Sequence, residues 1–95
     1  MVNYEAMFIV KPDLNEEQQK ELYAQLGEVI TRHNGGIVES KVWSERRRLA
    51  YPIKKSQDGI YYLVSFKAEA KQVLALKQAY RLNENILRLL VVRKD

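Results

Sequence analysis

The chain has 95 residues, which is enough for one hydrophobic core and too few for two. Its composition, 46% hydrophobic and 29% charged residues, is typical of a folded globular protein rather than a disordered one. The absence of cysteine excludes disulfides and thiolate metal sites, and the longest apolar run is far too short to span a bilayer. We therefore expect residues 1–95 to form a single cytoplasmic domain without a signal peptide.

The net charge of +4 is concentrated in one segment of the chain. From Lys41 to Lys55 six cations accompany one anion, so this segment carries +5 and the remaining residues sum to −1. A basic segment on a nearly neutral body indicates an anionic partner. The alternative is a solvated edge strand, because cations on edge strands also prevent aggregation.

Apolar periodicity in the first third of the chain predicts a strand followed by a helix. The strand runs from Tyr4 to Val10 and stops before Pro12. The helix begins after Asn15, a capping residue with Gln18 three positions later. It ends at 34–36, Asn-Gly-Gly, where we expect a glycine to supply the left-handed cap.

The remaining residues predict two strands, a helix and a last strand. The expected boundaries are a strand over 37–53 with a bulge near 44–45, a loop over 54–59, a strand over 60–68, a helix over 70–82 and a strand over 86–93. The order β-α-β-β-α-β predicts an α+β, ferredoxin-like split β-α-β fold. In that fold a four-stranded antiparallel sheet carries both helices on one face, and the arginine-rich strand lies at an edge.

The face of this sheet that points away from the helices is predicted to be apolar. Alternation in the first, third and last strands places on it Met7, Ile9, Tyr61, Leu63, Leu90 and Val92. Exposed apolar surface of this extent usually marks an interaction site, so we expect a partner protein to cover it. Partial cover by the long hairpin and self-association are the alternatives. Within the hairpin, the alternation of Leu49, Tyr51 and Ile53 with more polar positions predicts one apolar side.

Motifs for catalysis or cofactor binding are absent from the sequence. The one histidine, His33, falls in the last turn of the first helix, where a capping role is expected. Residues 59–66 have a passing likeness to an RNA-recognition pattern, but of its aromatic residues only Tyr61 is predicted on the open face. We expect no enzyme activity, no cofactor, no metal and no small-molecule substrate.

Motifs distributed along the whole chain occur in one register. They are Tyr4-Glu5, Pro12, Gly35-Gly36, Trp43, the run R-R-L-A-Y-P-I over 47–53, Gly59-x-Tyr61 and Asn85-Ile86-Leu87-Arg88. In these motifs the chain resembles the bacterial small-subunit ribosomal protein six family, and the run over 47–53 is the most specific of them.

The resemblance implies a structural role in the small ribosomal subunit. It implies binding to the central domain of small-subunit ribosomal RNA together with ribosomal protein eighteen, as a heterodimer in platform assembly. The cations expected to contact RNA are Arg46, Arg47, Arg48, Lys54, Lys55, Arg88 and Arg93. For Arg88 the alternative is an ion pair with Glu5 or Glu84. For the chain as a whole, the alternative function is that of a self-associating regulatory module with the same fold that binds no RNA.

Overall fold

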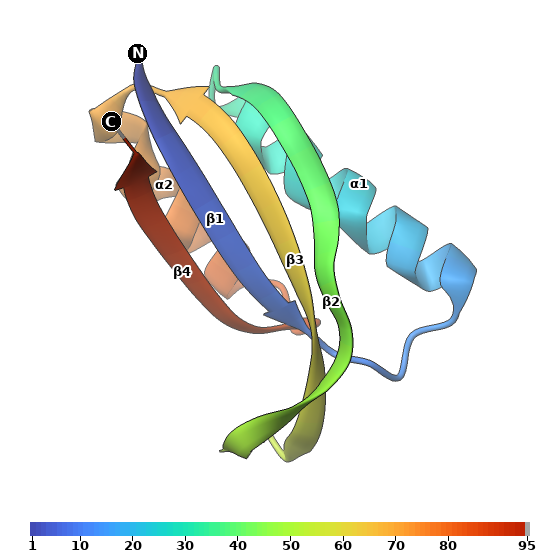
Figure 1. The fold of residues 1–95 in the computed structure, drawn as a ribbon. Helices are drawn as coiled ribbons and strands as arrows, with labels where there is room; N and C mark the ends of the chain where they lie inside the picture. The colour runs from blue at the N-terminus through green and yellow to red at the C-terminus, as the bar shows by residue number, and fades with distance from the viewer. Residues whose placement is uncertain (95) are drawn as a thin grey trace.

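The computed structural model describes residues 1–94 and has the predicted order of elements. They are β1 (Val2–Val10), α1 (Glu16–Arg32), β2 (Gly36–Ile53), β3 (Ser56–Ala68), α2 (Ala70–Arg81) and β4 (Ile86–Lys94). The strands form one antiparallel sheet in the order β2-β3-β1-β4. Both helices lie behind the sheet in Figure 1, and the face toward the viewer carries no helix. The predicted ferredoxin-like fold is confirmed, with β2 at an edge.

The main core lies between the sheet and the two helices. The central strands contribute Phe8 and Phe66, α1 contributes Leu26, and α2 contributes Leu76, all of them buried. Phe8 is 0% exposed, and its ring meets the ring of Tyr80 edge-on at 4.9 Å between centroids. Burial of these side chains is the main force that holds the helices against the sheet.

Tyr80 also connects the two helices through a hydrogen bond. Its buried hydroxyl donates to the Leu26 carbonyl oxygen of α1 at 2.5 Å. Burial raises the pKa of Tyr80 well above its ordinary value. The neutral phenol is therefore favoured in the folded chain. Tyrosine in the unfolded chain has a pKa of about 10. Below that pH the neutral phenol makes its full contribution to the free energy of unfolding, and the contribution is lost as pH rises above it.

Substitution of Tyr80 by phenylalanine tests this contact. We expect Tyr80→Phe to lower the free energy of unfolding at pH 7 by about 0.5–1.5 kcal/mol, because it removes a buried hydrogen bond between the helices. It should also make the loss of stability above pH 10 shallower. Urea denaturation at pH 7 and above pH 10 checks both expectations. Tyr51→Phe is the control, because Tyr51 is 67% exposed. Equal stability of Tyr80→Phe and the unsubstituted chain would contradict the role of the bond.

The two ends of α1 are built differently from each other. At the start, the Asn15 side chain accepts from the Gln18 backbone N–H at 2.8 Å and the Gln18 side chain accepts from the Asn15 backbone N–H at 3.0 Å, as predicted. At the end, the prediction of a glycine in the left-handed region is wrong. Asn34 has a φ of 64° and no glycine has a positive φ. Gly35 is required for space instead, because a Cβ there would lie 2.7 Å from Ile30 Cγ2.

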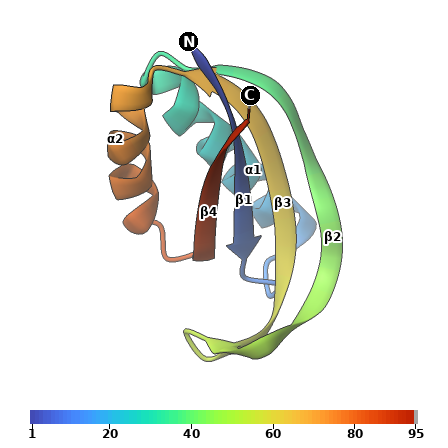
Figure 2. The same cartoon turned by 60° about the vertical axis from the view of Figure 1, so that its left-hand side comes forward.

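The β2–β3 hairpin extends beyond the other strands and curls beneath the ends of β1 and β4 (Figure 2). The curl packs Leu49 against Ile9 and Leu87, which form a second, smaller cluster of buried residues. Gly59 permits this approach, because a Cβ at that position would lie 2.5 Å from Ile9 Cγ2. The hairpin therefore covers one end of the open face, the partial cover that the sequence left as an alternative.

Two predictions within the hairpin are wrong. The expected loop over 54–59 is much shorter, because Ser56 already pairs with Ile53 and only Lys54 and Lys55 lie between the two strands. The expected apolar side is also incomplete, since Tyr51 is 67% exposed while Leu49 is buried. Register shifts between Arg48 and Ile53 interrupt the strict alternation on which that expectation depended.

Candidate nucleic-acid interface and open sheet face

We call residues 46–55, at the distal end of β2 and its turn, the basic hairpin tip. Three of its cations are oriented by contacts within the protein. Arg46 Nε donates to Asp58 Oδ2 at 2.9 Å. Arg47 places its guanidinium 5.3 Å from the centroid of the Trp43 ring. Lys54 Nζ donates to the Ile86 carbonyl oxygen at 3.0 Å, which ties the turn to the start of β4.

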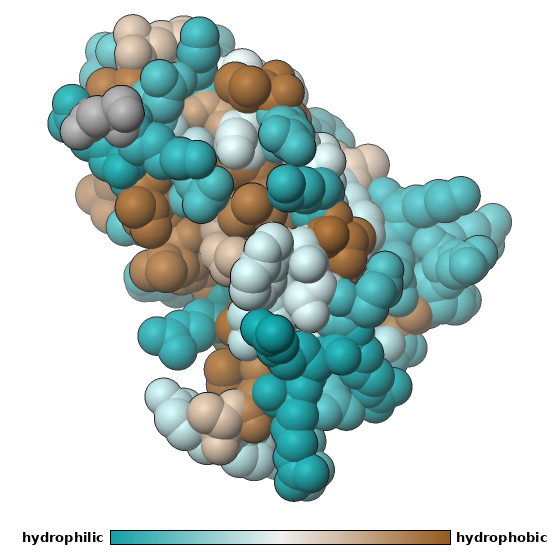
Figure 3. Space-filling view, in the orientation of Figure 1, coloured by the Kyte–Doolittle hydropathy of each residue, from teal (hydrophilic) through white to brown (hydrophobic). Residues whose placement is uncertain are grey.

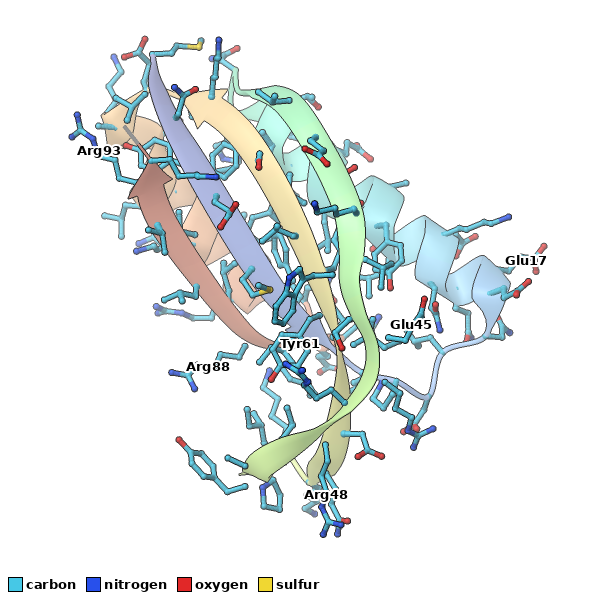
Figure 4. All side chains as sticks on the ribbon, in the orientation of Figure 1. Glu17, Glu45, Arg48, Tyr61, Arg88 and Arg93 are labelled. Carbon is cyan, nitrogen blue, oxygen red and sulfur yellow. The ribbon has the colours of Figure 1, made fainter. Side chains whose placement is uncertain are left out.

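Arg48 and Lys55 differ from these three. Both are exposed, and neither side chain forms a hydrogen bond or ion pair with any residue in the described range 1–94. Figure 4 shows Arg48 at the lower end of the hairpin, directed away from the sheet. They are thus available for an external anion without giving up a contact that holds the fold.

The turn at the hairpin tip has an unfavourable sequence for its geometry. Lys54 and Lys55 have φ values of 47° and 68°. A two-residue hairpin turn with both φ values positive favours Asn-Gly, and a residue with a Cβ costs roughly 1–2 kcal/mol in this region. Strain of this kind concentrates at functional sites.

Relief of this strain is expected to stabilise the chain. We expect Lys55→Gly to raise the free energy of unfolding by about 0.5–1 kcal/mol, the gain from removed strain being reduced by the greater freedom of glycine in the unfolded chain. Lys41→Gly in the body of β2 is the control. Since Lys41 has no positive φ, its replacement should lower stability. Denaturant titration measures both, and a loss of stability in Lys55→Gly would show that the lysine is not strained.

An aromatic pair on the open face was not found by sequence reasoning. Trp43 lies beside Tyr61 with 5.8 Å between ring centroids, and Trp43 is 51% exposed. Arg47 also lies 5.8 Å from the Tyr61 ring centroid, so one guanidinium contacts both rings. Register shifts between Val42 and Arg46 carry Trp43 next to Tyr61. The predicted bulge near 44–45 was the available signal for this placement.

The apolar residues predicted on the open face divide into three groups. Leu90 and Val92 on β4 are about half exposed, at 57% and 48%. Met7, Tyr61 and Leu63 are partly buried, and Ile9 is buried beneath the hairpin. Figure 3 shows hydrophobic surface along β4, and on the hairpin a hydrophilic ridge beside a smaller hydrophobic area. The accessible apolar surface is thus displaced toward the β4 edge.

The two cations predicted on β4 lie near opposite ends of that strand (Figure 4). Arg88 is exposed near its start, opposite Ile9 in the register, and Arg93 is exposed near its end. The alternative role of Arg88 as a partner of Glu5 is not realised, because Glu5 instead pairs with Lys94 at 3.1 Å. No ion pair joins Arg88 to Glu84 within the described residues either.

Other kinds of site find no support in residues 1–94. No group of three or more metal-ligating histidine, cysteine or carboxylate side chains occurs there, and no helix in this range is long and apolar enough to cross a membrane. His33 lies at the end of α1, with its Nδ1 2.8 Å from the Val29 carbonyl oxygen. That contact agrees with the predicted capping role.

The model of the family described as Ribosomal protein S6 matches residues 3–93. The chain belongs to this family. Members of the S6 family are structural, non-enzymatic components of the small ribosomal subunit, so the resemblance seen in the sequence motifs and the expectation of no enzyme activity are both confirmed.

Individual relatives agree with this assignment. The small ribosomal subunit protein bS6 of Helicobacter acinonychis is 46% identical over the whole chain, which spans 66% of that protein's length. The bS6 protein of Caldanaerobacter subterraneus is 37% identical and is covered over 99% of its length. The crystal structure of 30S ribosomal protein S6 from Thermotoga maritima superposes with a TM-score of 0.88 at 29% identity, covering 98% of this chain and 87% of that one.

Proposed function

We propose that the chain is a structural protein of the small ribosomal subunit that binds the central domain of ribosomal RNA together with ribosomal protein eighteen. The basic hairpin tip is the RNA-binding element, and the open sheet face is the surface for the partner protein. The observation that carries this proposal is the separation of the two surfaces: unpaired cations lie at the hairpin tip, while accessible apolar side chains lie along β4.

The hairpin tip is suited to phosphate by its mixture of fixed and unpaired cations. Arg46 and Arg47 are held in place by Asp58 and Trp43, which lowers the entropy that RNA binding must remove from them. Arg48 and Lys55 lose no internal contact on meeting a phosphate. An arginine fork can also hold a phosphate through two hydrogen bonds. If four to six phosphates are neutralised, the salt slope, which is the slope of log affinity for RNA against log salt concentration, should be on the order of −3 to −5.

The open face is suited to a protein by its apolar centre and charged borders. Leu90, Val92 and Leu63 supply side chains that release water when covered. Arg93 and Lys94 lie at the end of the same edge strand and form a polar border. Because aliphatic side chains predominate at this centre, a protein partner suits it better than stacked bases do.

A binding titration tests the proposal. A central-domain ribosomal RNA fragment is titrated with this chain, in the presence and absence of ribosomal protein eighteen, at several salt concentrations. We expect tight, salt-sensitive binding that requires the partner. If the chain alone bound RNA as tightly as it does with ribosomal protein eighteen, the proposal that RNA binding requires the heterodimer would be overturned. Failure to bind under both conditions, with self-association of the chain, would overturn RNA binding and favour a self-associating module.

A further inference from the structure

The structure contains a basic pocket at the junction of α2, β4 and the hairpin turn. Its volume is about 260 Å³, and it is lined by Lys54, Lys77, Tyr80, Arg81, Ile86, Leu87, Arg88 and Leu89. Four of these side chains are cationic and none is acidic. Lys77 and Arg81 come from α2, Arg88 from the strand that follows it, and Lys54 from the hairpin turn more than 20 residues earlier in the chain, so the fold brings these charges together.

We propose that this pocket binds a phosphate group of the RNA backbone, with Lys77 and Arg81 of α2 as binding residues beside Arg88. The proposal rests on the proposed function for its ligand, because it extends the RNA-binding surface from the basic hairpin tip to the end of α2. Figure 4 shows Arg88 projecting from the start of β4, on the side of the hairpin turn.

Three of the four cations, Lys77, Arg81 and Arg88, are not needed at this pocket to stabilise the fold, because their side chains bond to no described residue. Lys77 and Arg81 are separated by four positions in α2, a spacing at which like charges repel. Both are exposed and form no ion pair with a described residue. The helix dipole favours Arg81 in the last turn, but it does not account for Arg88 and Lys54 meeting it from other elements.

The backbone carbonyls around the pocket do not occupy the hydrogen-bond donors of Lys77, Arg81 and Arg88. The carbonyls of Ala79 and Tyr80 at the end of α2 already accept from the N–H groups of Leu82 and Asn83. The Ile86 carbonyl accepts from Lys54, and this bond holds one wall of the pocket in place. Lys77, Arg81 and Arg88 therefore keep their donors for an anion, which would relieve their mutual repulsion.

Paired substitutions test the pocket in the intact complex with RNA and ribosomal protein eighteen. We expect Lys77→Gln with Arg81→Gln to weaken RNA binding about fivefold near physiological salt and to reduce the magnitude of the salt slope by about 1, the effect of one phosphate contact. The control is Lys20→Gln with Lys71→Gln, which removes the same charge from exposed positions on both helices. This control should leave the slope unchanged.

A second measurement does not depend on RNA. Inorganic phosphate is titrated into the chain while backbone amide shifts are followed, and we expect saturable changes at Lys77, Arg81 and Arg88 that the double glutamine variant lacks. If the complex binds RNA but the double variant matches its control, the pocket proposal falls and the proposed function stands. If no RNA is bound, the proposed function falls; saturable phosphate shifts then still support an anion pocket, and their absence overturns it.

Discussion

Replacement of Arg48 and Lys55 together by alanine is expected to weaken RNA binding by the complex about 15–30-fold near physiological salt, and to leave the fold intact. The reason is that each phosphate contact contributes a slope of about 0.7–0.9 in log affinity against log salt, and two contacts are lost. The fold should persist because neither side chain bonds to a described residue. Binding isotherms over a salt series give the affinity and the slope.

The matched control for this pair is Lys20→Ala with Lys71→Ala. Both pairs lower the formal net charge from +4 to +2, but Lys20 and Lys71 lie on the helices, away from the hairpin tip. The control should retain nearly the unsubstituted affinity. An equal loss in both pairs would mean that RNA responds to net charge alone, and the hairpin tip would then not be the binding element.

Leu90→Glu is expected to weaken association with ribosomal protein eighteen by about 30-fold or more. A buried carboxylate without a partner at the centre of an interface typically costs at least ~2 kcal/mol. In the unbound chain Leu90 is 57% exposed, so the substitution should hardly change stability. The measurement is a titration of the two proteins in the absence of RNA, with a thermal melt of each variant.

Leu74→Glu is the control for the open face. Leu74 is also an exposed leucine, at 65%, but it lies on α2, behind the sheet. Association should therefore be unchanged by Leu74→Glu. If Leu90→Glu binds the partner as well as Leu74→Glu does, the open face near β4 is not the protein interface.

The order of elements was predictable because hydrophobic period and capping residues are local signals. Asn15 with Gln18 marked the start of α1 correctly, and the apolar central strands placed β2 at the edge. The turn was harder, because Lys54 and Lys55 adopt positive φ values that their residue type disfavours. Here the geometry of the paired strands overrides local preference.

The candidate sites were only partly predictable, because side-chain contacts depend on register. The sequence placed Arg46, Arg47 and Arg48 side by side, but the structure gives them three different surroundings: Asp58, an aromatic pair and open space. Two shifts of pairing between Val42 and Arg46 accompany these differences. Lys77 and Arg81 were missed because the pocket exists only where α2 and the hairpin turn converge on the start of β4.

A two-step amide-shift titration of the isotope-labelled chain tests the division between the two surfaces most directly. Ribosomal protein eighteen is added first, and we expect it to shift the amide signals of Leu63, Leu90 and Val92. The central-domain RNA fragment is added second, and the further shifts should appear at Arg46, Arg48 and Lys55. If RNA instead shifts the open face, or the partner protein shifts the hairpin tip, the assignment of RNA to the hairpin and protein to the sheet is contradicted.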